Sequence, residues 1–588
     1  MSKVIIVGAG MAGLAAAHEL VERGYQVEIY ERNEICGGKA RSIMVPNVGS
    51  GTPLPGEDGF RFFPGFYKHV PHTMLRIPFP GGPTGTVFDN LVDAKQIAIL
   101  QEGQPPYIFP SAVPTSVAEW KTALIALYSS PVLNLTMSDA EFFVSRILCL
   151  LSSCDQRRLE QYEQITWWDF IDAKNRSLQY QKICAMGLTR SLVAMQPTLA
   201  STRSVGTILI QILMDIVSVN GHADRVLNGP TNDVWIDPWV NHLKSKGVQL
   251  FLQWRATGLT YDAATNRVTS LQGMESGNPT TVTGDHYILA VPVEVSAKLI
   301  GTDIMHAAPS LANLNFLATA CTSWMVGIQF YLKRLLTSPI GHAIYADSPW
   351  AVTSIAQGQF WTAAMRAKYL TGQVQDVLSC DISDWFTKGD QVFTSSANQA
   401  TIEDQIKDEV WAEVKAHWVG SASGQLTDND LVTFFLSPQI KFQPTATDVE
   451  PLFINRVNSR QFRPKPTTKI LNLFVASDYV ITNTDLATME AANEAGRRAA
   501  NGILDVEGST VNRAAVFPLI EPPEFAPLKQ SDEILYSLDK STPALLCLLS
   551  PPSTGGPLTP TIPLSILGWI IVALLAVIVM LETLNLLW

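Results

Sequence analysis

The chain has no dense run of basic residues, and only 16% of its 588 residues are charged. Its 53 acidic residues outnumber its 42 lysines and arginines, which gives a formal net charge of −11 at pH 7. Nucleic-acid-binding domains usually concentrate positive charge on one face. Nucleic acid is therefore not predicted as a partner.

Metal-binding and disulfide patterns are also missing. None of the seven cysteines stands in a C-x-x-C pair, and the nine histidines include no H-E-x-x-H motif. Scattered cysteines without a paired framework are typical of a reducing compartment. We therefore predict neither a metal site nor a disulfide framework.

A glycine-rich turn lies near the start of the chain, within VIIVGAGMAGLAAAHELVERGYQVEIYER. The pattern predicts a buried strand, an Ala-rich helix and a second strand that ends at Glu31. Gly8, Gly10 and Gly13 have the G-x-G-x-x-G spacing in which a tight turn and a helix N-terminus bind a pyrophosphate. Because Glu31 would accept ribose hydroxyls, the arrangement predicts a dinucleotide-binding fold.

Three further stretches carry a resemblance to a known family. They are ERNEICGGKARS at 31–42, GEDGFRFFPGFYKH at 56–69, and NLFVASDY followed by ATMEAANEAGR between 472 and 497. Together they resemble the signatures of FAD-dependent carotene and phytoene desaturases of the flavin amine oxidase superfamily. The plant and cyanobacterial types and hydroxysqualene dehydroxylase-like proteins are the most similar. Arg61 stands where the plant-type enzymes have histidine, which leaves the substrate open.

The resemblance implies which residues bind FAD. In relatives the second glycine loop wraps the diphosphate, Asp478 accepts a ribityl hydroxyl, and Thr488 caps a helix aimed at the flavin N1–C2=O edge. Arg61 and Tyr67 are the candidate catalytic residues beside the ring. The predicted cofactor-binding set is Gly8, Gly10, Met11, Ala12, Gly13, Glu31, Arg32, Gly37, Gly38, Lys39, Ala40, Arg41, Gly59, Phe60, Arg61, Ala256, Asp478, Thr488 and Met489.

The predicted fold class is α/β, with a Rossmann-type (GR2) FAD-binding domain and an inserted α+β substrate domain. The FAD-binding domain is predicted to be discontinuous, at 1–90, 216–300 and 456–510. Two segments rich in apolar residues, 91–215 and 301–455, would form the substrate or lid domain. A Pro-rich linker at 511–561 would follow.

The C-terminal stretch IPLSILGWIIVALLAVIVML begins at residue 562 and contains no charged residue. Twenty such residues in a helix would reach across the roughly 30 Å of a bilayer core. We therefore expect a single-pass membrane anchor at 562–588. Lys529 and Lys540 precede this stretch and no basic residue follows it, which favours a catalytic body on the cytoplasmic side.

The predicted function is that of an FAD-dependent oxidoreductase acting on carbon–carbon bonds of an isoprenoid, carotenoid or other lipid, by hydride transfer to flavin N5. A lipid bilayer and a membrane quinone, as electron acceptor, are the expected partners besides the lipophilic substrate. Thr488 stands where amine oxidases tend to have an aromatic residue, which favours carbon–carbon chemistry. A flavin amine oxidase, a non-redox flavin isomerase and a flavin-binding protein without turnover stay open as alternatives.

Overall fold

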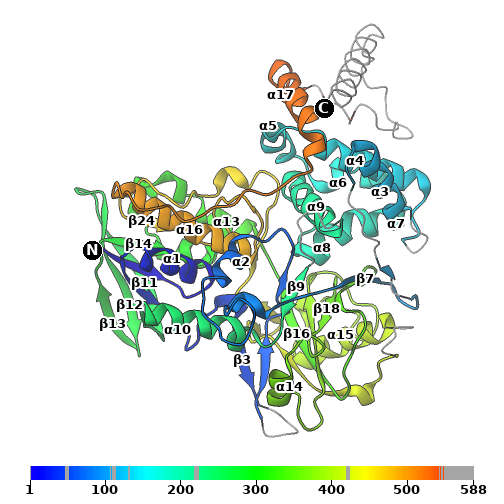
Figure 1. Ribbon diagram of the computed structural model, residues 1–588, viewed down its shortest axis with the longest axis horizontal. Helices are drawn as coiled ribbons and strands as arrows, with labels where there is room; N and C mark the ends of the chain where they lie inside the picture. The colour runs from blue at the N-terminus through cyan, green and yellow to red at the C-terminus, as the bar shows by residue number, and fades with distance from the viewer. Residues whose placement is uncertain are drawn as a thin grey trace. The chain divides into compact units, whose positions relative to one another are not determined.

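The computed structural model describes residues 2–46, 52–105, 107–108, 114–129, 133–217, 224–418, 424–541, 543–544 and 547. These residues all belong to one compact unit, residues 1–549. Within it, Figure 1 shows a parallel sheet with its helices, a second and larger sheet, and a group of helices.

The parallel sheet has five strands in the order β10–β2–β1–β14–β24. Its strands are β1 (Lys3–Val7), β2 (Gln26–Tyr30), β10 (Gln249–Phe251), β14 (His286–Leu289) and β24 (Leu473–Val475). All four pairings are parallel. The central strand is almost completely buried, as its unbroken apolar sequence requires. The predicted α/β Rossmann-type arrangement is present.

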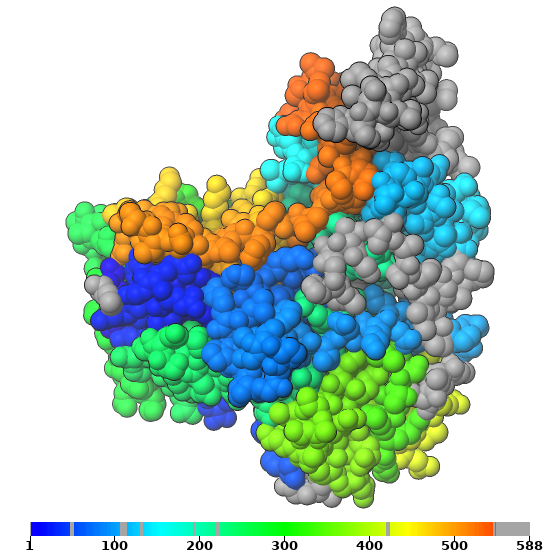
Figure 2. Space-filling view, in the orientation of Figure 1, coloured from blue at the N-terminus to red at the C-terminus, as the bar shows by residue number. Residues whose placement is uncertain are grey.

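Helices α1 (Met11–Val21) and α16 (Met489–Val506) pack against each other although they come from opposite ends of the sequence. Figure 2 shows the orange α16 region lying against the blue N-terminal region. α10 (Asp237–Ser245) also contacts α1. A three-stranded antiparallel sheet of β11 (Trp254–Asp262), β12 (Arg267–Glu275) and β13 (Asn278–Val282) adjoins this region. Three short helices follow β14, namely α11 (Val293–Leu299), α12 (Thr302–Ala307) and α13 (Leu314–Ala320).

The unit also contains four small sheets. They are β3 (Ser42–Val45) with β4 (Leu54–Glu57), β5 (Phe62–Phe63) with β9 (Arg225–Leu227) and β6 (Leu91–Asp93), β15 (Thr322–Ser323) with β23 (Leu452–Phe453), and β21 (Ile440–Phe442) with β22 (Ala446–Asp448). The short helix α2 (His69–Met74) follows β5.

The larger sheet has seven strands in the order β20–β16–β19–β18–β17–β7–β8. These are β7 (Gln96–Leu100), β8 (Tyr107–Ile108), β16 (Val326–Leu332), β17 (Gly341–Tyr345), β18 (Thr353–Ala356), β19 (Asp376–Ile382) and β20 (Leu431–Leu436). Only the β7–β17 pairing is parallel. α14 (Ala363–Tyr369) lies between β18 and β19 in the sequence.

The two faces of this sheet differ, because successive side chains on a strand point to opposite sides. On β19, Leu378, Cys380 and Ile382 pack into a core with α15 (Glu403–His417). The side chain of Asp381 lies on the opposite face of the sheet, and so does that of Thr353, its partner on β18. The sheet therefore keeps one apolar face under α15 and presents a second, partly polar face elsewhere.

A helical region completes the unit and has its own apolar core. Its helices are α3 (Val117–Tyr128), α4 (Met137–Ser152), α5 (Asp155–Arg157), α6 (Trp167–Phe170), α7 (Leu178–Tyr180), α8 (Leu188–Val193), α9 (Thr202–Ile216) and α17 (Ala526–Leu538), with π-helical turns at Arg158–Tyr162 and Gln181–Gly187. Trp167 at its centre is fully buried, and its indole N–H donates to the carbonyl of Cys184 at 2.9 Å.

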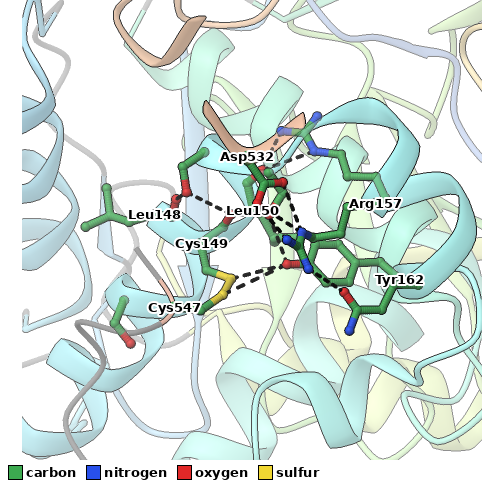
Figure 3. The surroundings of a disulfide bond; sticks show 12 residues. Leu148, Cys149, Leu150, Arg157, Tyr162, Asp532 and Cys547 are labelled. Atoms are coloured by element: carbon green, nitrogen blue, oxygen red, sulfur yellow. Dashed lines mark hydrogen bonds and ion pairs between the residues drawn. A yellow bond between two sulfur atoms is a disulfide. The ribbon is translucent and has the colours of Figure 1, made fainter. Parts of the chain in front are cut away.

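A disulfide joins Cys149 of α4 to Cys547, 398 residues further along the chain (Figure 3). Beside it, the guanidinium of Arg157 and the carboxylate of Asp532 form a fully buried ion pair, with Nη2 and Oδ1 2.8 Å apart. Together they attach the segment around α17 to the helical region. The expectation of unpaired cysteines is wrong for this pair, because no local spacing reveals a contact between such distant residues.

The prediction of a membrane anchor is corrected by the structure. Among the described residues, no helix is both long enough and apolar enough to cross a bilayer. Residues 562–588, on which the prediction rested, lie outside the described residues. The predicted localisation, a single-pass anchor with a cytoplasmic body, is therefore not retained.

Candidate functional site

A cavity of about 880 Å³ lies where the carboxyl ends of the parallel strands meet. Residues at or just beyond the ends of four strands of the sheet line it: Gly8 directly follows β1, Glu31 follows β2, Ala290 follows β14, and Asp478 lies three residues after β24. Open α/β sheets bind ligands in this position, outside the carboxyl ends of their strands. The sheet thus gathers side chains that are hundreds of residues apart in the sequence.

The glycine turn forms one wall of the cavity. Gly8, Gly10, Met11 and Ala12 line it, whereas Gly13 lies behind the turn. A Cβ atom on Gly13 would stand 1.9 Å from the carbonyl oxygen of Gly8. No side chain caps α1, so the N–H groups of its first turn can bind a phosphate.

Glu31 is held in place by the backbone of the turn. Its Oε2 accepts a hydrogen bond from the Ala9 N–H at 2.8 Å, and its Oε1 accepts one from the Asn33 N–H at 2.9 Å. The side chain is buried yet lines the cavity. Because each carboxylate oxygen can accept more than one hydrogen bond, Glu31 keeps capacity for a ribose.

The second glycine loop also lines the cavity, with Arg32, Gly37, Gly38, Lys39, Ala40 and Arg41. Its arginines share a partner that the sequence did not reveal: Glu450 contacts Arg32 at 2.5 Å and Arg41 at 3.2 Å. Burial alone would raise the pKa of Glu450, but the charges of Arg41 and Arg32 outweigh it and lower the pKa. Glu450 therefore stays ionised and holds both guanidinium groups at the cavity.

Four predicted cofactor-binding residues from later parts of the chain reach the same cavity. Ala256, Asp478, Thr488 and Met489 all line it. Thr488 caps α16 by accepting a hydrogen bond from the Ala491 N–H at 3.1 Å. The start of α16 thus faces the cavity with a defined cap.

The segments on either side of β5 bring the two candidate catalytic residues to the cavity, Arg61 before the strand and Tyr67 after it. Phe60, Arg61 and Tyr67 line it, and Gly59 does not. The guanidinium of Arg61 donates to the carbonyl of Lys39 at 3.2 Å and to that of Asp58 at 3.1 Å. Burial and the charge of Glu490 raise the pKa of Tyr67 above its usual range, so its phenol stays protonated.

Sequence reasoning also missed other titratable residues of the cavity wall, and three of them lie close to Arg61 or Phe60: Asp58, Asp381 and His342. Asp381 and His342 belong to the partly polar face of the seven-stranded sheet. No motif surrounds either residue. Only the pairing of β17, β18 and β19 brings them beside the loop that carries Asp58 and Arg61.

The cavity continues from the dinucleotide-binding loops into an apolar branch. We use this name for the part lined by the helical region, represented by Leu127, Leu133, Ile183, Leu209, Ile212 and Ile216. Ile97, Ile99 and Ile344 of the seven-stranded sheet line the cavity as well. Such a surface suits a large apolar molecule.

The residues of the wall fit FAD in three ways. The uncapped helix start and the glycine loops offer N–H groups to a diphosphate, and Glu31 offers acceptors to a ribose. Several buried polar atoms of cavity-lining residues, Nε of Arg61 and Oε2 of Glu294 among them, have no hydrogen-bond partner within the described part of the chain. A bound polar group would satisfy them.

One group of potential metal ligands occurs outside the cavity, formed by His18, Glu22 and His242. The indole N–H of Trp239 donates to Nδ1 of His18 at 3.0 Å. The proton of a neutral His18 imidazole is therefore on Nε2, which lies 3.0 Å from Glu22. Neither ring nitrogen of a neutral His18 therefore has a free lone pair for a metal, because Nδ1 accepts from Trp239 and Nε2 carries the proton.

Two family models match the chain. A model of an NAD(P)-binding Rossmann-like domain matches residues 6–76, and one of flavin containing amine oxidoreductase matches residues 223–504. Among curated proteins, 15-cis-phytoene desaturase of Synechococcus elongatus is 21% identical over 88% of this chain and 99% of its own length. Zeta-carotene desaturase of Synechocystis is 23% identical over 85% of this chain and 97% of its own length.

Solved structures share the fold. An oxidoreductase from Methanosarcina mazei matches with a TM-score of 0.56 at 12% identity, covering 86% of this chain and 100% of its own. Cyclohexylamine oxidase from Brevibacterium oxydans matches with a TM-score of 0.54 at 14% identity, covering 86% of this chain and 99% of its own. At these identities the likeness concerns the fold alone, and it confirms the predicted Rossmann-like FAD-binding architecture.

Proposed function

We infer that this chain, an FAD-dependent oxidoreductase similar in sequence to phytoene and zeta-carotene desaturases, acts on carbon–carbon bonds of a carotenoid-like substrate. The cofactor is FAD, as the family models and the curated relatives both indicate. The relatives' names supply the substrate class, and the cavity of this chain supplies the physical support for it.

The observation that carries the proposal is the continuity of one cavity. It joins loops that suit a dinucleotide to an apolar branch formed by helices α3 and α9 and their neighbours. A long hydrocarbon gains about 0.8 kcal/mol for each CH₂ group that it buries. An apolar substrate would therefore enter the branch spontaneously and place one of its carbons near the redox cofactor.

FAD, when bound, supplies a two-electron acceptor for the carbon–carbon bond. The chain's own residues bind and orient it: the glycine turn and Glu31 would hold the adenosine and diphosphate half, and Asp478 and Thr488 the flavin half. Arg61 and Tyr67 are proposed to lie beside the ring. The apolar branch would exclude water and fix the substrate against that end of the cavity.

An amine oxidase and a non-redox isomerase are the alternatives. The fold shared with cyclohexylamine oxidase admits the first, but the curated relatives that match over most of the chain are desaturases. Thr488 also replaces the aromatic wall expected for an amine site. No observation favours either alternative over carbon–carbon oxidation.

The electron acceptor, the source of the substrate and the division into domains are proposals as well. We propose a membrane quinone as the electron acceptor and the lipid bilayer as the source of the substrate. The division into an FAD-binding domain at 1–90, 216–300 and 456–510 and a substrate domain at 91–215 and 301–455 is proposed on the same basis. In that division the apolar branch belongs to the substrate domain, apart from Ile216 at its border.

The function can be tested in a bacterial host that accumulates phytoene or zeta-carotene. Expression of this chain should convert the polyene to products with more conjugated double bonds, since each desaturation removes two hydrogens. Pigments extracted from the cells would absorb at longer wavelengths and have lower masses. The same host with a chain carrying Glu31→Ala should show less conversion at equal protein level, because FAD binding is weakened. Unchanged pigments in cells that contain soluble, yellow wild-type protein would contradict the proposal.

A further inference from the structure

Asp58 and Asp381 lie on either side of Gly59, where the loop after β4 crosses the partly polar face of the seven-stranded sheet. Oδ1 of Asp58 accepts a hydrogen bond from the Gly327 N–H on β16 at 2.8 Å. The Phe60 N–H donates to the carboxyl of Asp381 on β19. Both carboxyl groups line the cavity, and we call them the carboxyl pair.

The close approach of loop and sheet is built into the backbone. A Cβ atom on Gly59 would lie 1.8 Å from Oδ1 of Asp381, and one on Gly327 would lie 1.7 Å from the Gly59 nitrogen. Gly59 also has a φ of +70°, which glycine adopts without strain. Glycine at both positions therefore lets the loop that carries Asp58 pass directly over β16 and against the carboxyl group of Asp381 on β19.

The carboxyl pair holds a proton at neutral pH. Burial raises the pKa of Asp381 to about 8, and the charge of Asp58 adds to this rise. Burial raises the pKa of Asp58 as well. Two adjacent carboxylates out of water do not ionise together, so one group of the pair is protonated and the other is ionised.

Several charged or titratable groups surround the pair from the neighbouring elements. They are Arg61, Lys39, Glu450, Asp448 and His342, and Cys380 lies next to Asp381 on β19 with its side chain on the opposite face. Arg61 and Lys39 favour the ionised form, and Glu450 and Asp448 oppose it. Burial raises the pKa of Cys380 and lowers that of His342 to about 4, so both are uncharged at neutral pH.

His342 adds an independent sign that a ligand lies here. It is only 5% exposed, it lines the same cavity, and its Nε2 has no hydrogen-bond partner among the described residues. Its ring lies 5.1 Å from that of Phe60, which follows Gly59 in the same loop. The polar face beside the carboxyl pair is thus part of the wall that a ligand would contact.

We propose that the carboxyl pair of Asp58 and Asp381 accepts the proton that the substrate loses during desaturation. The inference rests on the proposed function. One carbon gives up a hydrogen with both bonding electrons to FAD, and the neighbouring carbon gives up a proton to the ionised carboxylate. An O–H bond forms on the carboxyl group as this second C–H bond breaks, and its electron pair becomes the new C=C bond. The proton then passes to solvent.

The ionised member is the one that accepts the proton, so the sign of the pH dependence follows. Adding a second proton to the pair at low pH removes the acceptor, and the rate of substrate oxidation should fall there. The rate should rise with pH until one carboxylate is fully present. Removing one acid of the pair also removes the repulsion between them, and the acid limb of the profile should move to lower pH.

The test is the pH profile of flavin reduction by solubilised zeta-carotene in a single anaerobic turnover, for the flavin-loaded full chain. Asp381→Asn should shift the acid limb to lower pH. The double variant Asp58→Asn with Asp381→Asn should lose the limb and react roughly a hundredfold more slowly or worse, since general base catalysis contributes about that factor. Glu413→Gln is the matched control, because burial raises the pKa of Glu413 to about 8 as well and the residue does not line the cavity.

A second readout does not need turnover. Infrared titration of the flavin-loaded protein without substrate should show protonated carboxyl groups that ionise above neutral pH, Glu413 among them, and Asp381→Asn should remove one of these bands. Glu413→Gln should leave that band in place. If the double variant fails to load FAD, the proposal can still be tested, because the titration compares the single variants Asp381→Asn and Glu413→Gln.

The outcomes distinguish an error in the role of the carboxyl pair from an error in the proposed function. Wild-type rate and pH profile in the double variant would overturn the role of the carboxyl pair and leave the proposed function standing. Persistence of every titrating band in Asp381→Asn would also overturn it. If zeta-carotene and phytoene fail to reduce the wild-type flavin at any pH, the proposed function is overturned and this step falls with it.

Discussion

Replacing Gly13 by alanine should weaken FAD binding roughly a hundredfold. The new Cβ atom would stand 1.9 Å from the carbonyl oxygen of Gly8 and 3.3 Å from the Cβ of Ala290. Neither atom can move freely, because Gly8 lies in the turn and Ala290 directly follows β14. Overpacking of this kind costs about 3 kcal/mol, which corresponds to roughly a hundredfold in affinity if the turn opens.

The measurement is the FAD content after dialysis, followed by titration with free FAD. Gly258→Ala is the matched control: it makes the same chemical change in β11, where a Cβ atom meets nothing within 4 Å. Circular dichroism would show whether the Gly13→Ala protein keeps its helices. A Gly13→Ala protein that binds FAD as tightly as wild type would mean that the glycine turn does not hold the cofactor in the way described.

Replacing Ile212 by arginine should stop the oxidation of a polyene and leave the flavin in place. Ile212 lies on α9 and lines the apolar branch. A charged side chain there would either lose its hydration when substrate enters or fill the branch itself. Burying an unpaired polar or charged group costs about 3 kcal/mol or more, so turnover should fall at least roughly a hundredfold.

The control is Ile212→Leu, which conserves volume and should stay within a few-fold of wild type. FAD content and reduction of the flavin by dithionite should be unchanged in both variants. If the arginine variant oxidised zeta-carotene at the wild-type rate, the substrate would have to reach the flavin by another route.

The dinucleotide half of the site could be predicted from the sequence because its parts are local. A glycine turn, the helix after it and Glu31 follow one another within a single strand–helix–strand unit, and each has a spacing with a known physical use. The structure places Glu31 and the second glycine loop on one cavity wall. Gly13 is the exception, since it lies behind the turn and packs against Gly8.

The part of the cavity wall that the seven-stranded sheet supplies could not be read from local spacing. Asp381, Thr353 and His342 come from three strands, and strand pairing brings them to one face. Each looks like an ordinary polar residue in its own strand. Glu450 was missed for the same reason: its partners Arg32 and Arg41 are about 400 residues away.

Two expectations rested on composition alone, and both needed correction. The cysteines show no spacing pattern, yet Cys149 and Cys547 form a disulfide. The apolar stretch after residue 561 predicts a membrane anchor, yet no helix in the described part of the chain can span a bilayer.

The central claim is that a polyene, and not an amine, gives its electrons to the flavin bound by this chain. The direct test is to mix flavin-loaded protein with solubilised phytoene or zeta-carotene in the absence of oxygen, and to compare a panel of primary amines. The account predicts that a polyene bleaches the visible flavin absorbance and that an equal amount of product with one more double bond appears. A flavin that stays oxidised with the polyenes and is bleached by an amine would contradict it.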